Sequence, residues 1–493
     1  MLVDQLDREQ AVDPTGSFIV QAPAGSGKTG LLVRRILTLL GVVERPEEIL
    51  AITFTRKATA EMRERVLEAL ETAKTGGTFK SYEQDLADYA RRALERDREM
   101  QWHLLQQPRR LRIQTIDSLC AELVRKMPWS TRFGGAPQVE NDLGSLYAQA
   151  AQNLLEKIDQ DSLTSELSAL LFYANGDLQN LQQQLANMLH SRESWLELIF
   201  THQALDSREA LEQSWLELAE EAIARLESIC GPAFAAELTG LMQYAQDKLL
   251  ASEHEVDDAH HAALKEASPR DDPALRLLRW KLVAKMLCTD KGAIRTRITR
   301  ANGFPNKDAC KQRVEEILAE IADNEELRDA LQAVGKIPHP EISDTEWDRL
   351  CALNTVLPAL AQELYVIMVE RNCADYDELA RRAIDALGTP EQPSDLALVQ
   401  DYRIRHILMD EFQDTSPTQL QLLRQLVAGW QGNEPGRSLF LVGDPMQSLY
   451  GFRKADVRVF LNVREEGIGD IRLQALELKV NFRSSPDIID WVN

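Results

Sequence analysis

The sequence has few cysteines, and they are too far apart to form a metal site or a disulfide framework. Its six cysteines, the first at Cys120 and the last at Cys373, form no CxxC pair within 493 residues. This spacing disfavours a zinc site, an iron–sulfur site and structural disulfides. The sequence also lacks a run of about 18 apolar residues, and its start, MLVDQLDREQ, is charged rather than signal-like. We therefore expect a cytoplasmic protein without membrane insertion.

Basic residues are in the minority. The chain has 56 Lys and Arg against 78 Asp and Glu, which gives a formal net charge of −22. A uniformly basic surface that coats a polyanion is therefore excluded, and any contact with nucleic acid must be local. Apolar residues make up 44% of the chain, enough at this length for about two or three domain cores. The composition predicts a multidomain globular protein.

Strand-like runs stand in the first and last parts of the chain. From residue 18 to about residue 70 the pattern is strand, glycine turn, helix, strand and long charged helix, which is how a parallel α/β sheet begins. Three further apolar runs fit buried strands, at residues 111–116, 403–410 and 438–444.

The middle of the chain has a different pattern. From roughly residue 141 to 370 it is rich in Leu, Ala, Gln and Glu at helical spacing, with hardly any strand pattern. The sequence therefore predicts an α/β fold with one parallel sheet. Residues 1–140 and 371–475 would form this sheet, and an all-helical insertion at 141–370 would interrupt it.

The stretch QAPAGSGKTG, residues 21–30, places a glycine turn between a strand and a helix. In such a loop Gly25 and Gly27 let backbone N–H groups face phosphate oxygens. Lys28 would reach the β and γ phosphates, and Thr29 would offer its hydroxyl to Mg²⁺. The sequence therefore predicts a site for ATP and Mg²⁺. The residues expected to line it are Ala22, in place of the usual first glycine, Gly25, Ser26, Gly27, Lys28 and Thr29.

An acidic pair, Asp410 and Glu411, ends the apolar run at 403–410. The carboxyl end of such a strand faces the ligand crevice of a parallel sheet. Asp410 would hold Mg²⁺ through water, and Glu411 would orient and deprotonate an attacking water. Taken alone, this pair is more often a helix cap. Its combination with the phosphate loop makes the catalytic interpretation specific.

Four stretches resemble, in order, the motifs of the UvrD/Rep group of superfamily-one DNA helicases. They follow AGSGKT and are ITFTRKATAEMRERV, ILMDEFQDT, LVGDPMQSLYGFRKAD and LKVNFRSSPDII. The resemblance is dense in residues 1–70 and 400–493. The helical insertion of about 230 residues, with YDELARRAIDAL after it, looks more like the RecB and AddA branch, the exonuclease V type, than like compact Rep-like enzymes.

The resemblance implies a RecA-like ATPase lobe split by a helical lobe, with residues 476–493 beginning a second motor lobe. It implies an ATP-dependent helicase that moves along single-stranded DNA in repair or recombination. Travel from 3′ to 5′ rests on the resemblance alone. The implied partners are single-stranded and duplex-junction DNA and a helicase–nuclease subunit. We expect no nuclease in these residues, and weak turnover from them alone, because later motifs of the second lobe are missing.

The same resemblance assigns roles around the nucleotide. Gln10 matches the glutamine that reads adenine, and an ordinary surface glutamine is the alternative. Gln447 matches the glutamine that senses the γ-phosphate. Phe482 and Arg483 match the aromatic residue that stacks on adenine and the arginine that reaches the γ-phosphate. The catalytic candidates are thus Lys28, Asp410, Glu411, Gln447 and Arg483.

Single-strand trackers stack bases on aromatic faces and hold the backbone with local donors. The resemblance implies this role for three aromatic residues and for three polar residues that would contact phosphate. Taken singly, each aromatic beside a buried strand is more often part of the core, and Arg63 fits a solvated helix face equally well. The expected DNA-contacting residues are Phe54, Thr55, Arg56, Arg63, Tyr450 and Phe452.

Two positions depart from the family pattern. Asp117 stands where relatives usually have histidine, and its carboxylate would repel DNA phosphate. Gly30 stands where many relatives have arginine. A phosphate donor is therefore missing there, or Arg34 or Arg35 replaces it.

The helical insertion contains a basic island. Between Arg276 and Arg313 there are eleven basic residues, which would suit contact with a DNA backbone. A solvated face paired with neighbouring acids is the alternative.

Two other classes of function remain open. A P-loop phosphotransferase would use AGSGKT but would have no need for LVGDPMQSLYGFRK. A non-catalytic DNA-binding or assembly module would keep the shape of the motifs without turnover.

Overall fold

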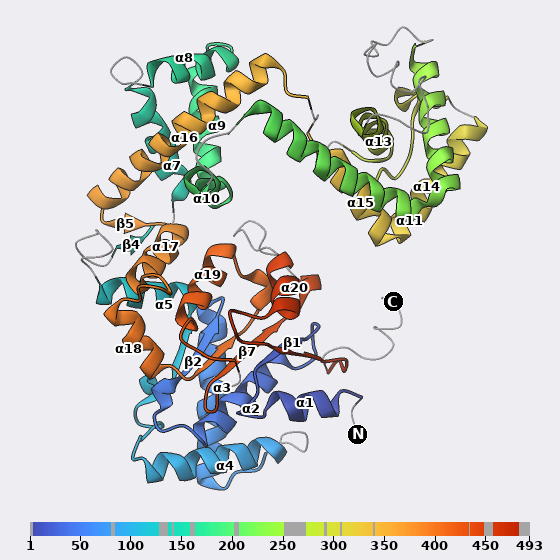
Figure 1. The fold of residues 1–493 in the computed structure, drawn as a ribbon. Coiled ribbons are helices and arrows are strands. Elements are labelled where there is room, and N and C mark those ends of the chain that lie inside the picture. Colours follow the sequence, from blue (N-terminus) through green and yellow to red (C-terminus); the bar gives the residue numbers. More distant parts are fainter. Residues whose placement is uncertain are drawn as a thin grey trace. The chain divides into compact units, whose positions relative to one another are not determined.

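The structure, a computed structural model, divides the chain into two compact units. One unit is made of residues 1–154, 182–194 and 360–493, and the other of residues 155–181 and 195–359. The ribbon of both is drawn in Figure 1. The residues that the structure describes are 3–79, 84–127, 137–140, 142–157, 163–201, 207–250, 273–289, 293–305, 308–338, 341–432, 434–447 and 457–482.

A six-stranded parallel sheet forms the centre of the first unit, so the predicted α/β fold is confirmed. Its strands are β1 (Phe18–Gln21), β2 (Ile49–Thr53), β3 (Arg112–Thr115), β6 (His406–Met409), β7 (Ser438–Gly443) and β8 (Gln474–Glu477). They lie in the order β3-β2-β6-β7-β1-β8, and every pair of neighbours runs parallel. Strands β2, β6 and β7 are buried along their whole length, as expected of a parallel sheet covered on both faces.

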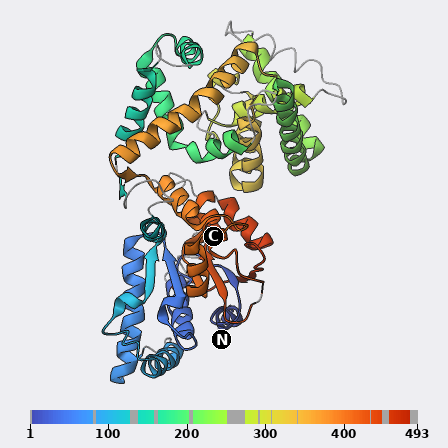
Figure 2. The same ribbon diagram turned by 60° about the vertical axis from the view of Figure 1, so that its left-hand side comes forward.

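Helices cover the two faces of this sheet (Figures 1 and 2). Because side chains alternate along a strand, Val20 joins one core with α2, α3 and α4, while Ile19 joins the other with α5, α17, α19 and α20. The helices described in this unit include α1 (Gln5–Ala11), α2 (Lys28–Leu40), α3 (Arg56–Thr75), α4 (Gln84–Glu99), α5 (Ile116–Lys126), α7 (Leu143–Leu155), α17 (Tyr376–Leu387), α18 (Asp395–Arg403), α19 (Pro417–Leu426) and α20 (Val457–Glu466). A small parallel pair, β4 (Gln138–Val139) and β5 (Cys373–Ala374), completes it.

The sheet unit extends beyond the ranges that composition suggested. Strand β8 pairs with β1 and runs to Glu477, two residues past the expected boundary at 475. Residues 142–154, 182–194 and 360–370, which have a helical pattern like the insertion, cluster with the sheet. Composition alone separates helix from strand, but it does not say against which core a helix packs.

The described part of the second unit is built from helices. In α11 the backbone of Gly231 leaves the helical region (φ 70°, ψ 159°) before Pro232, so this helix is two segments joined at a kink. Buried side chains of α11, α13, α14 and α15 form one core. The helices are α8 (Thr164–Tyr173), α9 (Leu178–His190), α10 (Arg192–Thr201), α11 (Arg208–Leu250), α13 (Pro273–Leu287), α14 (Ala309–Asp323), α15 (Glu325–Lys336) and α16 (Asp344–Glu370), of which α9, α10 and α16 run across the division between the units.

Helix α16 is the one described helix long and apolar enough to cross a membrane, by length and composition only. A third of its most apolar window, 33%, is buried inside the protein. The core helices of soluble proteins pass the same test, so a single helix of this kind is a weak indication of a membrane span.

A buried polar cluster lies beneath β6 and β7. Arg35, on α2, is fully buried, and its guanidinium donates to the Gly16 carbonyl at 2.7 Å and to Ser438 Oγ at 3.1 Å. The Nδ1 atom of His406 lies 2.8 Å from the same Ser438 oxygen. The guanidinium also stacks over the Phe440 ring, 5.1 Å from its centroid. This cation therefore stabilises the strand ends from inside the core.

Acid should weaken the fold through His406. Burial, and then the charges of Arg35 and Arg405, lower the pKa of His406 to about 3, against about 6.5 in an unfolded chain. Between these two values the unfolded chain binds a proton that the folded chain does not, so stability is lost as pH falls from 6.5 towards 3. Between pH 7.5 and pH 5 we expect the free energy of unfolding to fall by about 2 kcal/mol more in the parent than in His406→Asn.

Urea denaturation of both proteins at pH 7.5 and pH 5 measures the effect. Comparing each protein with itself at pH 7.5 cancels the packing cost of the substitution. Equal losses in the parent and in His406→Asn would contradict the prediction.

Candidate functional site

The predicted phosphate loop connects β1 to α2. Gly25 (φ 79°) and Gly27 (φ 88°) have left-handed backbone conformations that glycine adopts at little cost. The loop begins at Ala22, whose N–H donates to the Gly443 carbonyl at 2.9 Å. Ser26 is buried, and its Oγ has no hydrogen-bond partner in the part of the chain that the structure describes. A phosphate oxygen would supply this partner, so the loop fits a nucleotide.

Lys28 opens α2 and contacts the acidic strand end. Its Nζ lies 3.0 Å from Glu411 Oε2, although the two residues are 383 positions apart. Glu411 has a left-handed backbone (φ 52°), which is strained for a residue with a side chain and is typical of functional sites. Gln413 Nε2 donates to the same carboxylate oxygen at 2.9 Å. The structure thus brings the loop lysine and the candidate base together.

Asp410 is almost completely buried beside this pair. Burial, and then the charge of Glu411, raise its pKa to about 7, and Lys28 offsets part of this rise. Its N–H donates to the Ile52 carbonyl at 2.9 Å, which continues the pairing of β6 with β2 by one residue. Thr29 lies in the first turn of α2.

A divalent cation beside the nucleotide would relieve the buried charge of Asp410, so the donor set fits Mg²⁺. In the described residues no group of three or more His, Cys, Asp or Glu is placed to hold a metal by itself. This agrees with the habit of Mg²⁺, which binds through one or two carboxylates, water and substrate phosphates.

Gln413 links the acidic pair to the end of β7. Its Oε1 accepts from the Asp444 N–H at 2.9 Å, and Gln447 Nε2 donates to the Asp444 carboxylate. A Cβ on Gly443 would lie only 2.6 Å from Gln413 Oε1. Hydrogen bonds therefore run from Lys28 through Glu411, Gln413 and Asp444 to Gln447. Sequence reasoning missed Gln413, whose only signal is its place two residues after Glu411.

The mouth of the loop is bordered by Arg8 and Phe482. The Phe482 N–H donates to the Gly25 carbonyl at 2.8 Å, and its ring is 58% exposed. The guanidinium of Arg8 lies over this ring, 5.0 Å from the centroid, and donates to the Ser26 carbonyl at 2.9 Å. Gln10 is exposed on α1. Arg483, the expected γ-phosphate arginine, lies outside the described residues.

Asp4 holds Arg8 in this position. Its carboxylate accepts from Arg8 at 2.9 and 2.8 Å and from the N–H groups of Lys479 and Val480 at 2.9 and 3.1 Å. Burial alone would raise the pKa of Asp4, but these hydrogen bonds outweigh it and lower the pKa to about 2. Sequence reasoning missed both Asp4 and Arg8, because the partners that tie this pair to the site are distant in the sequence: Lys479 and Val480 for Asp4, and Ser26 and Phe482 for Arg8.

Apart from the phosphate loop, a hollow of about 430 Å³ opens at the carboxyl ends of β2 and β3. Thr55 caps the N-terminus of α3, Thr115 caps that of α5, and Tyr376 is the first residue of α17. Helix N-termini attract anions, and here three of them border one hollow. Its lining residues are Phe54, Thr55, Arg56, Thr115, Asp117, Ser118, Ala121, Arg125, Val139 and Tyr376.

The other expected DNA contacts have different positions. Arg63 does not line this hollow, and its guanidinium donates to the Ile113 carbonyl. Tyr450 and Phe452 lie outside the described residues. Sequence reasoning missed Arg125 and Tyr376, because only the fold brings α5 and α17 beside Phe54.

The expectation that Arg35 replaces a phosphate donor at position 30 is wrong. Arg35 is fully buried and donates to main-chain carbonyls, so it cannot reach the loop. Arg34 pairs with Asp85 at 2.7 Å and donates to the Gly30 carbonyl at 3.2 Å.

Part of the basic island is neutralised by acids. Arg276 pairs with Glu227 at 2.7 Å, and Arg313 pairs with Glu237 at 2.6 Å. Lys291 and Lys307 lie outside the described residues. These pairs favour a paired helix surface over an open DNA-binding face.

Comparison with known proteins finds matches along nearly the whole chain. The family described as UvrD/REP helicase N-terminal domain matches residues 4–467. Similar proteins, each named as one subunit of an ATP-dependent helicase/nuclease, include those of Desulfitobacterium hafniense (28% identical, over 99% of this chain and 35% of that protein), Anoxybacillus flavithermus (27%, 98% and 39%) and Latilactobacillus sakei (24%, 99% and 54%). The chain thus spans about a third to a half of the length of these relatives.

Gly443 should be intolerant of any side chain. A Cβ there would lie 2.6 Å from Gln413 Oε1 and 3.0 Å from both the Gln413 nitrogen and a carbon of the Phe460 ring. Overpacking of this kind costs about 1–3 kcal/mol, so Gly443→Ala should destabilise the protein by that amount in urea denaturation. Gly144→Ala on α7 is the matched control, because its nearest atom would be 4.0 Å away. Equal stability of the two variants would refute the close approach.

Proposed function

Because the chain belongs to the UvrD/REP helicase family, we propose that it forms the ATP-hydrolysing motor of a DNA helicase in DNA repair or recombination. The observation that carries this proposal is the 3.0 Å contact between Lys28 and Glu411. Phosphate loops serve many enzymes, but this loop lies against an acidic pair at a strand end. Such a pair supplies the metal-holding and water-activating groups that hydrolysis needs.

Lys28 and Glu411 have complementary roles in the proposed reaction. When nucleotide binds, Lys28 leaves the Glu411 carboxylate and pairs with the β and γ phosphates. The N–H groups of Gly25 and Gly27 bind phosphate oxygens. Glu411 is thereby released from its cation but remains bound to Gln413. The free carboxylate then accepts a proton from the attacking water. Thr29 and Asp410 would hold Mg²⁺, which neutralises charge on the phosphates.

The chain of hydrogen bonds beyond Glu411 offers a route for coupling. Gln413 bonds to both Glu411 and the Asp444 N–H, so a movement of Glu411 changes the support of Asp444 and Gln447. We assign Gln447 the role of sensing the γ-phosphate. Arg483 would reach that phosphate from the segment that follows Phe482.

The base would lie at the exposed face of Phe482. An aromatic ring beside the loop offers adenine a stacking surface, and Gln10, exposed on α1, offers an amide to its edge. Arg8 fixes the ring by its cation–π contact.

Single-stranded DNA would bind in the hollow at the ends of β2 and β3. The caps at Thr55 and Thr115, with Arg56 and Arg125, suit backbone phosphates. Tyr376, which is partly exposed, suits a base. Phe54 lines the same hollow but is only 8% exposed, so it offers little of its ring for stacking. Tyr450 and Phe452 keep their proposed role as base-stacking residues from the resemblance alone. Arg63 is the weaker candidate because its guanidinium is bound to the Ile113 carbonyl.

The relatives extend the proposal to partners and location. Their printed name describes one subunit of an ATP-dependent helicase/nuclease, and all of those compared are bacterial. We therefore propose a second, partner subunit for this chain, together with action on duplex junctions, travel from 3′ to 5′ and a place in the bacterial cytoplasm.

Two substitutions should separate binding from catalysis. Lys28→Ala removes the charge that pairs with phosphate, so nucleotide binding should weaken about 10- to 100-fold. Glu411→Gln keeps the shape and removes the base, so ATP should still bind while turnover falls about 10²- to 10⁴-fold. A fluorescent ATP analogue measures nucleotide binding, and the ATPase rate with and without single-stranded DNA measures turnover.

Glu465→Gln, at an exposed position on α20, is the control and should leave both quantities unchanged. Parental turnover by Glu411→Gln would exclude Glu411 as the base. The ATPase rate of the unsubstituted protein tests the expectation of weak turnover.

The DNA hollow has its own test in Arg125. Arg125→Ala removes an exposed cation from the hollow, so affinity for labelled oligo(dT) should fall about 3- to 10-fold and the salt slope should fall by about 0.7. Lys126→Ala is the matched control, since Lys126 pairs with Glu122 and does not line the hollow. Fluorescence anisotropy over a range of salt concentrations measures both the affinity and its salt slope. An unchanged salt slope for Arg125→Ala would mean that DNA does not bind in this hollow.

A further inference from the structure

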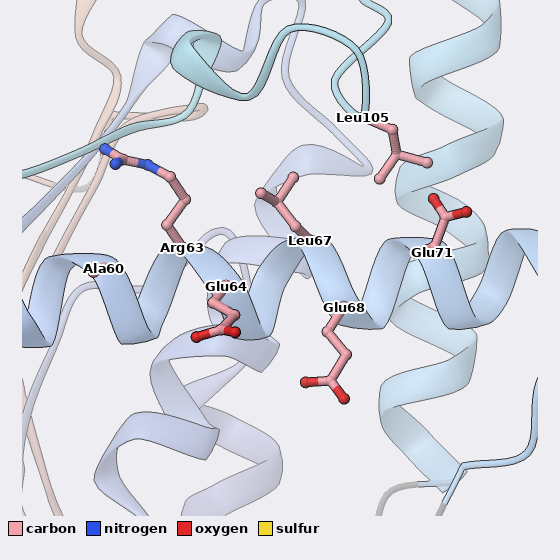
Figure 3. A pocket seen from close by; sticks show the side chains of 7 residues that line it. All are labelled: Ala60, Arg63, Glu64, Leu67, Glu68, Glu71 and Leu105. Carbon is pink, nitrogen blue, oxygen red and sulfur yellow. The ribbon is translucent and has the colours of Figure 1, made fainter.

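A further hollow lies on α3, and Arg63 is the one residue that it shares with the proposed DNA contacts. It has a volume of about 530 Å³ and is shown in Figure 3. Leu67 on α3 and Leu105, in the loop after α4, give it an apolar floor, and both are partly buried against the core. Its lining residues are Ala60, Arg63, Glu64, Leu67, Glu68, Glu71 and Leu105.

Three carboxylates border this floor. Glu64, Glu68 and Glu71 follow one another on α3 at spacings of four and three residues, and all three are exposed. In Figure 3, Glu64 and Glu68 project to one side of α3, and Glu71 rises towards Leu105. None of the three carboxylates has an ion pair or hydrogen bond within the described residues. By contrast Glu61, one turn earlier, pairs with Arg65 at 2.6 Å.

The three carboxylates destabilise α3 as long as nothing neutralises their charge. Like charges at these spacings repel each other across the helix surface. Glu71 also stands next to the last turn of α3, which ends at Thr75, so the negative end of the helix dipole adds to the repulsion there. Arg63 is the one cation in the lining, and its guanidinium donates to the Ile113 carbonyl instead. Among the described residues, the acidic border therefore has no cation paired with it.

We propose that this hollow is a docking site for a basic amphipathic segment of a partner protein. An apolar side chain of the partner fits between Leu67 and Leu105, and its Lys or Arg side chains pair with Glu64, Glu68 and Glu71. Charge complementarity selects this occupant. The carboxylates repel nucleic acid, and a second copy of a chain with a net charge of −22 is also repelled.

A designed peptide tests the proposal on the intact chain. The probe is a fluorescein-labelled amphipathic helix of about 16 residues, with Leu at positions i and i+4 and Lys on both flanks. The comparison probe has every Lys replaced by Glu. We expect saturable binding of the basic peptide, weakened by salt, and none of the acidic peptide.

Two protein variants separate the two parts of the site. Combining Glu64→Gln, Glu68→Gln and Glu71→Gln should weaken binding at least about 10-fold and remove most of its salt dependence. Leu105→Ala should weaken binding while keeping the salt dependence.

The control removes three charges elsewhere, by combining Glu217→Gln, Glu220→Gln and Glu221→Gln on α11, and should bind like the parent. Equal weakening in this control would mean that the peptide responds only to net charge. That result, absence of saturable binding, or binding of the acidic peptide would each overturn the proposal. Neither ATPase activity nor DNA binding is measured, so the proposal succeeds or fails independently of the motor.

Discussion

The contact of Lys28 with Glu411 depends on a single constraint, namely that all strands of a parallel sheet end on the same edge. Strands β1, β6 and β7 deliver the phosphate loop, the acidic pair and Asp444 to that edge. Gln413 reaches both Glu411 and Asp444 because Gly443 leaves room for its side chain. In the resting site Lys28 is neutralised by Glu411. A phosphate must therefore compete with a carboxylate, which favours polyphosphates over small anions of low charge.

Much of this edge could be predicted from the sequence, since its signals are local. The glycines of residues 22–29, the apolar run before Asp410 and the strand pattern at 438–444 are each contained within about ten residues. Strand β8 carried no such signal. Its burial pattern leaves one of four side chains buried, so periodicity did not mark it, and its assignment rests on pairing with β1.

The rest of the site depends on contacts between distant residues. Arg34 and Arg35 are neighbours in one helix, and their sequence gives no reason to bury one of them. Arg35 is buried because the carbonyls of residues 11 and 16 and the Phe440 ring surround it. In the same way Asp4 ties Arg8 to the far end of the chain only because the N–H groups of Lys479 and Val480 also reach its carboxylate. Polar residues of this kind acquire a function from their neighbours in space, which a single sequence does not reveal.

The topology of the sheet also fixes the order in which the protein is able to fold during synthesis. Strand β1 ends at residue 21, and its neighbours in the sheet, β7 and β8, begin at residues 438 and 474. The ribosome must add 438 − 21 = 417 residues before β1 finds a partner, which takes about 20–80 s at ordinary rates of translation. Throughout that time an apolar strand has both edges unpaired. Nascent chains are thus exposed to aggregation for as long as the helical insertion is being made, and they cannot bind nucleotide before it is complete.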